Sequence, residues 1–241
     1  MSRSKTLVLP VLLTLIVALI AASPASAAEK KVRLFILSGQ SNMAGLNPNL
    51  SFTPAVEKAF AGDDVIVVKH AQGGQPIRRW YKKWQLPTNA TETKTAPKNG
   101  DLYDELMAAV KKALGDKKPD SVAFVWMQGE RDAKAGWHSV YYEALRGTVE
   151  QIRGDLNHKE IAVVVGRLSD HLKQNANWDT VRAAQEKVAS DEPLGAWVDT
   201  DDLNNKNGKD DLHYTSEGYA ELGRRFAARA VELMRKQETS K

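Results

Sequence analysis

Five short apolar runs recur along this 241-residue chain, and most are separated by segments in which apolar residues return every three or four positions. Each run is nearly continuous in apolar residues, which is typical of strands that are covered on both faces. Strands that alternate with helices predict a mostly parallel five-stranded sheet inside a three-layer α/β/α sandwich. The runs are VRLFILS at residues 32–38, VIVVKHA at 65–71, SVAFVWMQ at 121–128, IAVVVGRL at 161–168 and AWVDT at 196–200.

Four longer segments have the pattern of the helices that such a sandwich needs. Within residues 101–115, Leu102, Leu106 and Val110 share one helical face, and Gly115 can end the helix. The other helices are expected over residues 137–154, 178–190 and 215–236.

The first 27 residues have the parts of a secretory signal peptide. Arg3 and Lys5 precede an apolar run over residues 7–22, and residues 25–27 read ASA, a small-x-small cleavage pattern. We expect cleavage after Ala27 and a secreted or periplasmic protein without membrane association. An uncleaved anchor is the alternative, because the run is close to the lower limit of roughly 17 residues for a spanning helix. The mature chain, residues 28–241, has a length suited to one domain.

Composition argues against nucleic acid as a partner. The chain has 34 basic and 30 acidic residues, and loss of Arg3 and Lys5 with the signal leaves a nearly neutral chain without a polybasic run. Cysteine is absent, so an exported protein of this size relies on its core and not on disulfides. The histidines other than His213 have no metal-ligand spacing, so no metal or other cofactor is expected.

Reactive side chains follow the predicted strands at their carboxyl ends, where ligands gather in an open parallel sheet. The four stretches are GQSNM at residues 39–43, AQGGQPI at 71–77, WMQGERDA at 126–133 and DDLHYTSEG at 210–218. Together they contain a hydroxyl, a glycine pair, an amide beside a carboxylate, and a histidine with acidic neighbours. These groups are the ones that serine-dependent acyl transfer requires.

Ser41 is the candidate nucleophile and His213 the candidate base. A serine hydroxyl attacks an ester only if a base takes its proton, and a histidine oriented by a carboxylate suits that task. Asp210, three residues before His213, is the expected carboxylate, and Asp211 is an alternative because a turn can aim either side chain. His213 without a catalytic role, as a residue at the entry of a helix, is the alternative interpretation.

A tetrahedral intermediate also needs donors that face its oxyanion. The candidates are the backbone N–H of Ser41, the N–H of Gly73 or Gly74, and the side-chain amide of Gln128. A plain turn at the glycine pair and a loop-holding role for Gln128 are the alternatives.

These motifs resemble the blocks of the SGNH-hydrolase superfamily, and more narrowly its branch of sialate O-acetylesterase-like proteins and acetyl xylan esterases of carbohydrate esterase family six. The resemblance extends from residue 34 to about residue 226. It implies a flavodoxin-like fold, Ser41 as nucleophile, His213 as base, and metal-free deacetylation of a carbohydrate. By matching position, Ser41, Gly74 and Gln128 line the oxyanion hole, and Glu130 in QGE becomes an alternative to Asp210 as the acid.

The expected activity is removal of acetyl groups from a glycan through an acetyl-enzyme intermediate. The alternatives are a glycan-binding module that has lost turnover, and a lipase or thioesterase of the same superfamily that acts on longer acyl chains. Trp80 and Trp84, in RRWYKKWQ at residues 78–85, are candidates for a sugar-stacking wall, or else they cover the edge of the sheet. The irregular stretch at residues 86–100 is either a rim of the substrate cleft or a surface loop without function.

Overall fold

The computed structural model describes residues 29–88, 90, 97–204 and 211–239. Its centre is one five-stranded sheet in which all neighbouring strands are parallel and the spatial order is β2-β1-β3-β4-β5. The strands are β1 (Val32–Gly39), β2 (Asp64–Ala71), β3 (Ser121–Met127), β4 (Ala162–Gly166) and β5 (Gly195–Val198). The predicted parallel sheet is therefore confirmed, and each strand begins and ends within two residues of its expected bounds.

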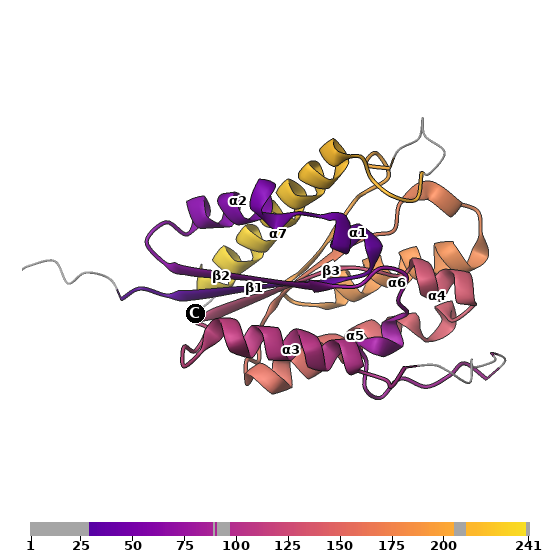
Figure 1. Cartoon of the computed structure of the whole chain (residues 1–241), viewed down its shortest axis with the longest axis horizontal. Coiled ribbons are helices and arrows are strands. Elements are labelled where there is room, and N and C mark those ends of the chain that lie inside the picture. The colour runs from indigo at the N-terminus through magenta and orange to yellow at the C-terminus, as the bar shows by residue number, and fades with distance from the viewer. Residues whose placement is uncertain (1–28, 89, 91–96, 205–210, 240–241) are drawn as a thin grey trace, which may run out of the picture.

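Helices cover both faces of this sheet (Figure 1). The helices α2 (Phe52–Ala59) and α7 (Ser216–Thr239) lie on one face, and α3 (Asp101–Leu114), α5 (Tyr141–Leu156) and α6 (Ala176–Asp191) lie on the other. The result is the predicted three-layer α/β/α sandwich with flavodoxin-like strand order.

Two short helices at the carboxyl ends of strands were not predicted. They are α1 (Ser41–Gly45), which follows β1, and α4 (Glu130–Ala135), which follows β3. Both are too short to show a helical stripe in the sequence, as are the 3-10 turns η1 (Pro48–Leu50), η2 (Ile77–Arg79), η3 (His138–Val140) and η4 (Asp170–Leu172).

Burial explains why the central strands show no alternation of polar and apolar residues. Every residue of β3 and β4 is buried, and so is every residue of β1 after Val32. The edge strands β2 and β5 are only partly buried, because each has a neighbouring strand on one side alone.

The order of the strands fixes where a ligand can bind. The chain passes from β1 outward to β2 and then returns across β1 to β3, so the direction of winding reverses between β1 and β3. A crevice forms at such a switch point, outside the carboxyl ends of the two strands. The segments that begin at Gln40 and Gln128 leave the sheet at this point.

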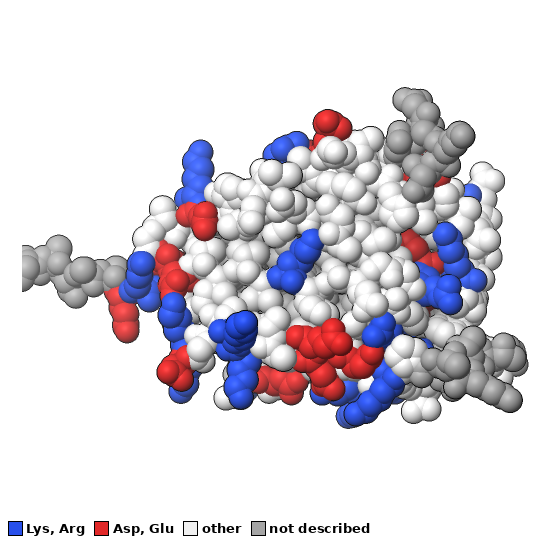
Figure 2. Space-filling model, viewed as in Figure 1, with Lys and Arg blue, Asp and Glu red and all other residues white. Residues whose placement is uncertain are grey.

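The face seen in Figure 2 has acidic and basic side chains side by side, most of them along the edge that α3 occupies in Figure 1. No single sign of charge dominates this face. None of the described helices is long and apolar enough to span a membrane. The expected signal peptide, residues 1–27, lies outside the described residues.

Candidate active site

The turn after β1 delivers Ser41 to the first position of α1. Gly39 makes this turn possible because it adopts a φ of 146° and lies against β3, where a Cβ would stand 1.9 Å from the carbonyl oxygen of Met127. The Gln40 N–H then donates to the Met127 carbonyl at 2.9 Å. The serine is thus held at the carboxyl edge by backbone contacts between the two central strands.

His213 reaches the same point from the other end of the chain. It precedes α7 by three residues and follows Leu212, whose carbonyl accepts a hydrogen bond from Asn42 at 3.1 Å. The His213 Nε2 atom lies 3.1 Å from Ser41 Oγ, although 172 residues separate them. Both side chains are half-buried. The structure therefore brings the predicted nucleophile and base into hydrogen-bond contact.

Asn42 is a site residue that our sequence analysis did not assign. Its side-chain amide donates to Glu130 Oε1 at 3.0 Å and to the Leu212 carbonyl, and its oxygen accepts from the Tyr219 hydroxyl at 3.1 Å. These bonds join the turn that bears Ser41 to the segment that bears His213. The signal available in the sequence was the position of Asn42 inside GQSNM, directly after the candidate nucleophile.

The three candidate acids have different surroundings. Asp210 lies outside the described residues. The Asp211 carboxylate pairs with Nδ1 of His171, which follows β4. Glu130 is buried, and no described residue forms a hydrogen bond with its Oε2 atom. Burial raises the pKa of Glu130, while the Asn42 hydrogen bond and the charge of His213 favour its ionised form.

The glycine pair lies directly beside the serine. A Cβ on Gly73 would stand 3.6 Å from Ser41 Cβ, and Gly74 has a φ of 70° that favours glycine. Among the described residues, none accepts a hydrogen bond from the backbone N–H of Ser41 or of Gly74. Because unsatisfied N–H groups beside a nucleophile can bind a developing oxyanion, both remain candidates for that role.

Gln128 lies at the same edge but is fully buried. Its Nε2 atom donates to Asp132 Oδ2 at 2.5 Å and to the Gln75 carbonyl at 3.0 Å, and it stands 3.3 Å from Gln40 Oε1. Both amide hydrogens therefore have protein acceptors. To donate to an oxyanion, this amide would have to give up one of these acceptors. The oxyanion role of Gln128 remains a prediction.

Trp80 and Trp84 do not present a ring to solvent, because they are 0% and 5% exposed. The Trp80 N–H donates to Ser38 Oγ at 2.9 Å, and its ring packs edge-on against Trp126 at 5.2 Å between centroids. Trp84 stacks against Trp137. The structure thus places both indoles in the core, and a sugar-stacking wall made of these two rings does not fit it.

The irregular stretch at residues 86–100 is only partly described, since residues 89 and 91–96 lie outside the described part. Pro87, Thr88 and Ala90 line a cavity of about 540 Å³ together with Gly136 and His138, at the end of α4. Its lining does not include Ser41 or His213. Within the described ranges there is no group of three or more histidine, aspartate or glutamate side chains with the placement of a metal site.

An open parallel sheet with a serine and a histidine in contact at its switch point has the arrangement of an α/β esterase. The comparison with known families agrees. The chain belongs to the family described as carbohydrate esterase, sialic acid-specific acetylesterase, which matches residues 44–232. This confirms the resemblance seen in the motifs, and the matched range includes His213 and begins three residues after Ser41.

Solved structures share the fold at low sequence identity. A protein from Arabidopsis thaliana is 20% identical with a TM-score of 0.61, over 84% of this chain and 98% of that one. A novel carbohydrate acetylesterase from Xanthomonas citri is 18% identical with a TM-score of 0.63, over 86% of this chain and 57% of that one. A carbohydrate acetylesterase from Sinorhizobium meliloti is 15% identical with a TM-score of 0.50, over 85% and 100%. No curated protein matches the chain by sequence.

Proposed function

We propose that this chain is a serine-dependent carbohydrate O-acetylesterase that works through an acetyl-enzyme intermediate. The single observation that carries the proposal is the 3.1 Å contact between Ser41 Oγ and His213 Nε2 at the switch point of the sheet. Membership of the esterase family supports the reaction class. Two of the structural neighbours bear the name carbohydrate acetylesterase, which supports the acetyl group as the one removed.

In the first half of the reaction, Ser41 Oγ attacks the acetyl carbonyl while its proton passes to His213 Nε2. The carbonyl oxygen becomes an oxyanion, for which the N–H groups of Ser41 and Gly74, which donate to no described residue, are the candidate donors. The bond between the carbonyl carbon and the sugar oxygen then breaks. His213 gives its proton to that oxygen, so a free sugar hydroxyl leaves and the acetyl group stays on Ser41.

In the second half, water takes the place of the serine. His213 removes a proton from water as the water attacks the acetyl-serine carbonyl, and the same N–H groups face the second oxyanion. The Ser41 oxygen leaves and receives the proton back from His213, which releases acetate. A carboxylate near His213 stabilises the imidazolium in both halves, with Asp210 or Glu130 as the proposed group.

The family description names sialic acid, which supports an O-acetylated sialic acid as one candidate substrate. Acetate release from O-acetylated sialic acid and from acetylated xylan, measured side by side with the same enzyme, identifies the preferred sugar. Hydrolysis of long-chain esters in preference to acetates would favour a lipase or thioesterase. Binding of either glycan without acetate release would favour a glycan-binding module.

The acetyl-enzyme gives the sharpest test of the mechanism. Wild-type protein mixed with an aryl acetate and quenched in acid is expected to carry the added mass of one acetyl group, located on the peptide that contains Ser41. Ser41→Ala should carry none. His213→Gln should carry far less of this label than wild type. His158→Gln is the matched histidine control and should be labelled like wild type, because His158 lies beside the carbonyls of Glu160 and Asp120. Labelling of another residue, or none in an active enzyme, contradicts the proposal.

Export is a separate proposal that concerns residues 1–27. If they form a cleaved signal, protein recovered outside the cytoplasm of the producing bacterium should begin at Ala28, which N-terminal sequencing can establish.

A further inference from the structure

Asp132 occupies an unusual position for a carboxylate, because it is fully buried and joins two segments of the site. Its Oδ2 atom accepts the Ile77 N–H at 2.9 Å and the Gln128 amide at 2.5 Å. The same Gln128 amide donates to the Gln75 carbonyl at 3.0 Å. Asp132 and Gln128, which we call the buried clamp, therefore hold residues 75–77 against the end of β3.

The segment held by the buried clamp is the one that carries the glycine pair. At its start, the Gln72 N–H donates to the Gly39 carbonyl at 3.1 Å, which ties it to the turn of the serine. At its end, Ile77 begins the 3-10 turn η2, so its N–H has no partner within that turn and Asp132 supplies one. Between these two ties, the N–H groups of Gly73 and Gly74 donate to no described residue, and the Gly73 carbonyl accepts a hydrogen bond from the Gln75 side chain at 3.0 Å.

The position of the glycine N–H groups thus depends on contacts outside the glycine pair itself. Two glycines in sequence have wide conformational freedom, and a donor that is free to move contributes little to a transition state. With both ends held, the loop has less freedom to move, and Gly73, the neighbour of Gly74, lies beside Ser41. No hydrogen bond joins the buried clamp to Ser41 itself. The clamp reaches the serine turn through this loop and through the Gln128 amide, which stands 3.3 Å from Gln40 Oε1.

We propose that Asp132 is a positioning residue of the esterase, which sets the oxyanion-binding N–H of Gly74 by anchoring Ile77 and the Gln128 amide. The inference rests on the proposed function, and it adds a role for a residue that touches neither substrate nor nucleophile. It also gives Gln128 a role in the architecture of the loop, whether or not its amide reaches the oxyanion.

Two substitutions at Asp132 separate the effect of its hydrogen-bond acceptor from the effect of its negative charge. Asp132→Ala removes both acceptor bonds and frees the loop. Asp132→Asn keeps one oxygen that can accept from Ile77 and from Gln128. Because loss of one oxyanion donor typically costs 100- to 1000-fold in kcat, we expect Asp132→Ala to lower kcat by roughly 30- to 300-fold with KM changed by less than about threefold. Asp132→Asn should stay within about fivefold of wild type.

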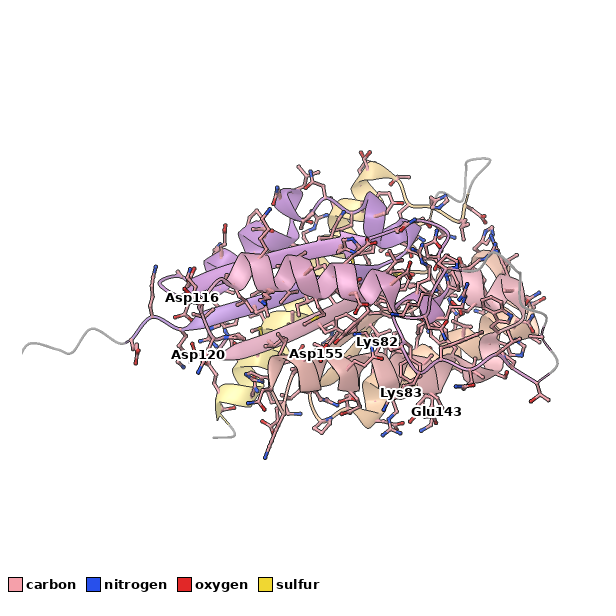
Figure 3. All side chains as sticks on the ribbon, turned by 60° about the horizontal axis from the view of Figure 1, so that its bottom comes forward. Lys82, Lys83, Asp116, Asp120, Glu143 and Asp155 are labelled. Atoms are coloured by element: carbon pink, nitrogen blue, oxygen red, sulfur yellow. The ribbon has the colours of Figure 1, made fainter. Side chains whose placement is uncertain are left out.

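Asp155 provides a matched control carboxylate. It accepts a hydrogen bond from the Tyr103 hydroxyl at 2.7 Å in the helical layer of α3 and α5, and Figure 3 shows it between Asp120 and Lys82. Asp155→Ala is expected to leave kcat unchanged. Thermal unfolding of all variants confirms that each is folded at the assay temperature.

A second readout does not depend on turnover. Amide hydrogen exchange of Gln72 and Ile77, whose N–H groups are hydrogen-bonded, should accelerate in Asp132→Ala, remain slow in Asp132→Asn, and be unchanged in Asp155→Ala. A folded Asp132→Ala with wild-type kcat, or equal losses of kcat in the Ala and Asn variants, would overturn the proposal and leave the esterase function standing. If wild-type protein releases no acetate from any ester and Ser41 is never acetylated, the proposed function itself fails, and the role of Asp132 fails with it.

Discussion

The two sides of the candidate site are built differently. The serine side is part of the sheet: Gly39 lies against Met127, Gln40 bonds to the Met127 carbonyl, and Asn42 is buried. The histidine side is a segment between the strand edge and α7, in which residues 211–213 are all half-buried. Its described ties include side-chain contacts, from Asn42 to the Leu212 carbonyl and from His171 to Asp211, and a β-bridge between Asn204 and Tyr214.

This difference has a consequence for how each side tolerates change. A substitution that disturbs the serine turn also disturbs the contact between the two central strands, so fold and chemistry are coupled there. On the histidine side, the chemistry depends on a few polar contacts at the margin of the core. Substitutions there should alter activity without altering the free energy of unfolding by much.

The largest effects should come from the reacting pair, and they test whether the two sides act as one unit. Ser41→Ala and His213→Gln are each expected to lower kcat by a factor on the order of 10,000 or more, because neither group can act without the other. The double variant should be no slower than the slower single variant. Steady-state kinetics with an aryl acetate gives the values. Multiplicative losses would mean that the two residues act independently.

The acid partner of His213 should give the next effect, and it tests the histidine side alone. We expect Asp210→Asn to lower kcat by a factor on the order of 10,000, since the charge that stabilises the imidazolium is lost. Asp211→Asn and Glu130→Gln should retain most of the activity. If Glu130→Gln is the damaging change while Asp210→Asn resembles wild type, the carboxylate comes from the serine side, through the contact of Glu130 with Asn42.

Asn42 connects the two sides, and its removal should produce an intermediate effect. Asn42→Ala loses the bonds to Glu130, Leu212 and Tyr219, so His213 is less well oriented. We expect kcat to fall roughly 10- to 100-fold and stability to fall by about 1–3 kcal/mol, the usual cost of stranding buried polar groups. Tyr219→Phe, which removes only one of these bonds, is the matched control. Equal kcat values for Asn42→Ala and wild type would show that the two sides are positioned independently.

The last prediction concerns stability on the serine side, through Asp132. Burial raises the pKa of Asp132 to about 7, whereas an unfolded aspartate titrates near its ordinary value. Because the folded state holds the proton more tightly, this group's contribution is fully present below the unfolded pKa and is lost as pH rises to about 7. Each unit between the two pKa values corresponds to about 1.4 kcal/mol.

Chemical denaturation at several pH values measures this contribution. The free energy of unfolding of wild type should fall relative to that of Asp132→Asn between about pH 4 and pH 7, and the difference should stay constant above that range. A difference that does not vary with pH would mean that the carboxyl of Asp132 has an ordinary pKa in the folded protein.

The sheet and the reacting pair could be predicted because each leaves a local signature. Buried strands are continuous apolar runs. Ser41 closely follows a predicted strand, and His213 shortly precedes a predicted helix, so both positions follow from the alternation of strands and helices. The position of Asp132 beside Gln128 could also be expected from their shared loop, but the role of Asn42 and the contact of Asp132 with Ile77 could not be predicted in this way. They depend on the direction of side chains relative to segments tens of residues away, which periodicity does not encode.

Trp80 shows how a local pattern can mislead. Its position among cationic residues suggested a solvent-facing wall, but Arg78 and Arg79 are themselves buried. Arg78 donates to the Pro97 carbonyl and to Asn99, and Arg79 pairs with Asp101. The two arginines are therefore held inside the protein by later parts of the chain, and the indole that follows them packs in the core.

The 172-residue separation of Ser41 and His213 also affects how the site forms during synthesis and folding. The serine leaves the ribosome together with β1 and α1. The histidine leaves it much later, just before α7. Under the proposed mechanism, the serine has no base to take its proton until the segment that bears His213 has been synthesised and α7 has packed beside β3 and β4. Turnover would therefore report the docking of α7, which is a long-range step of folding.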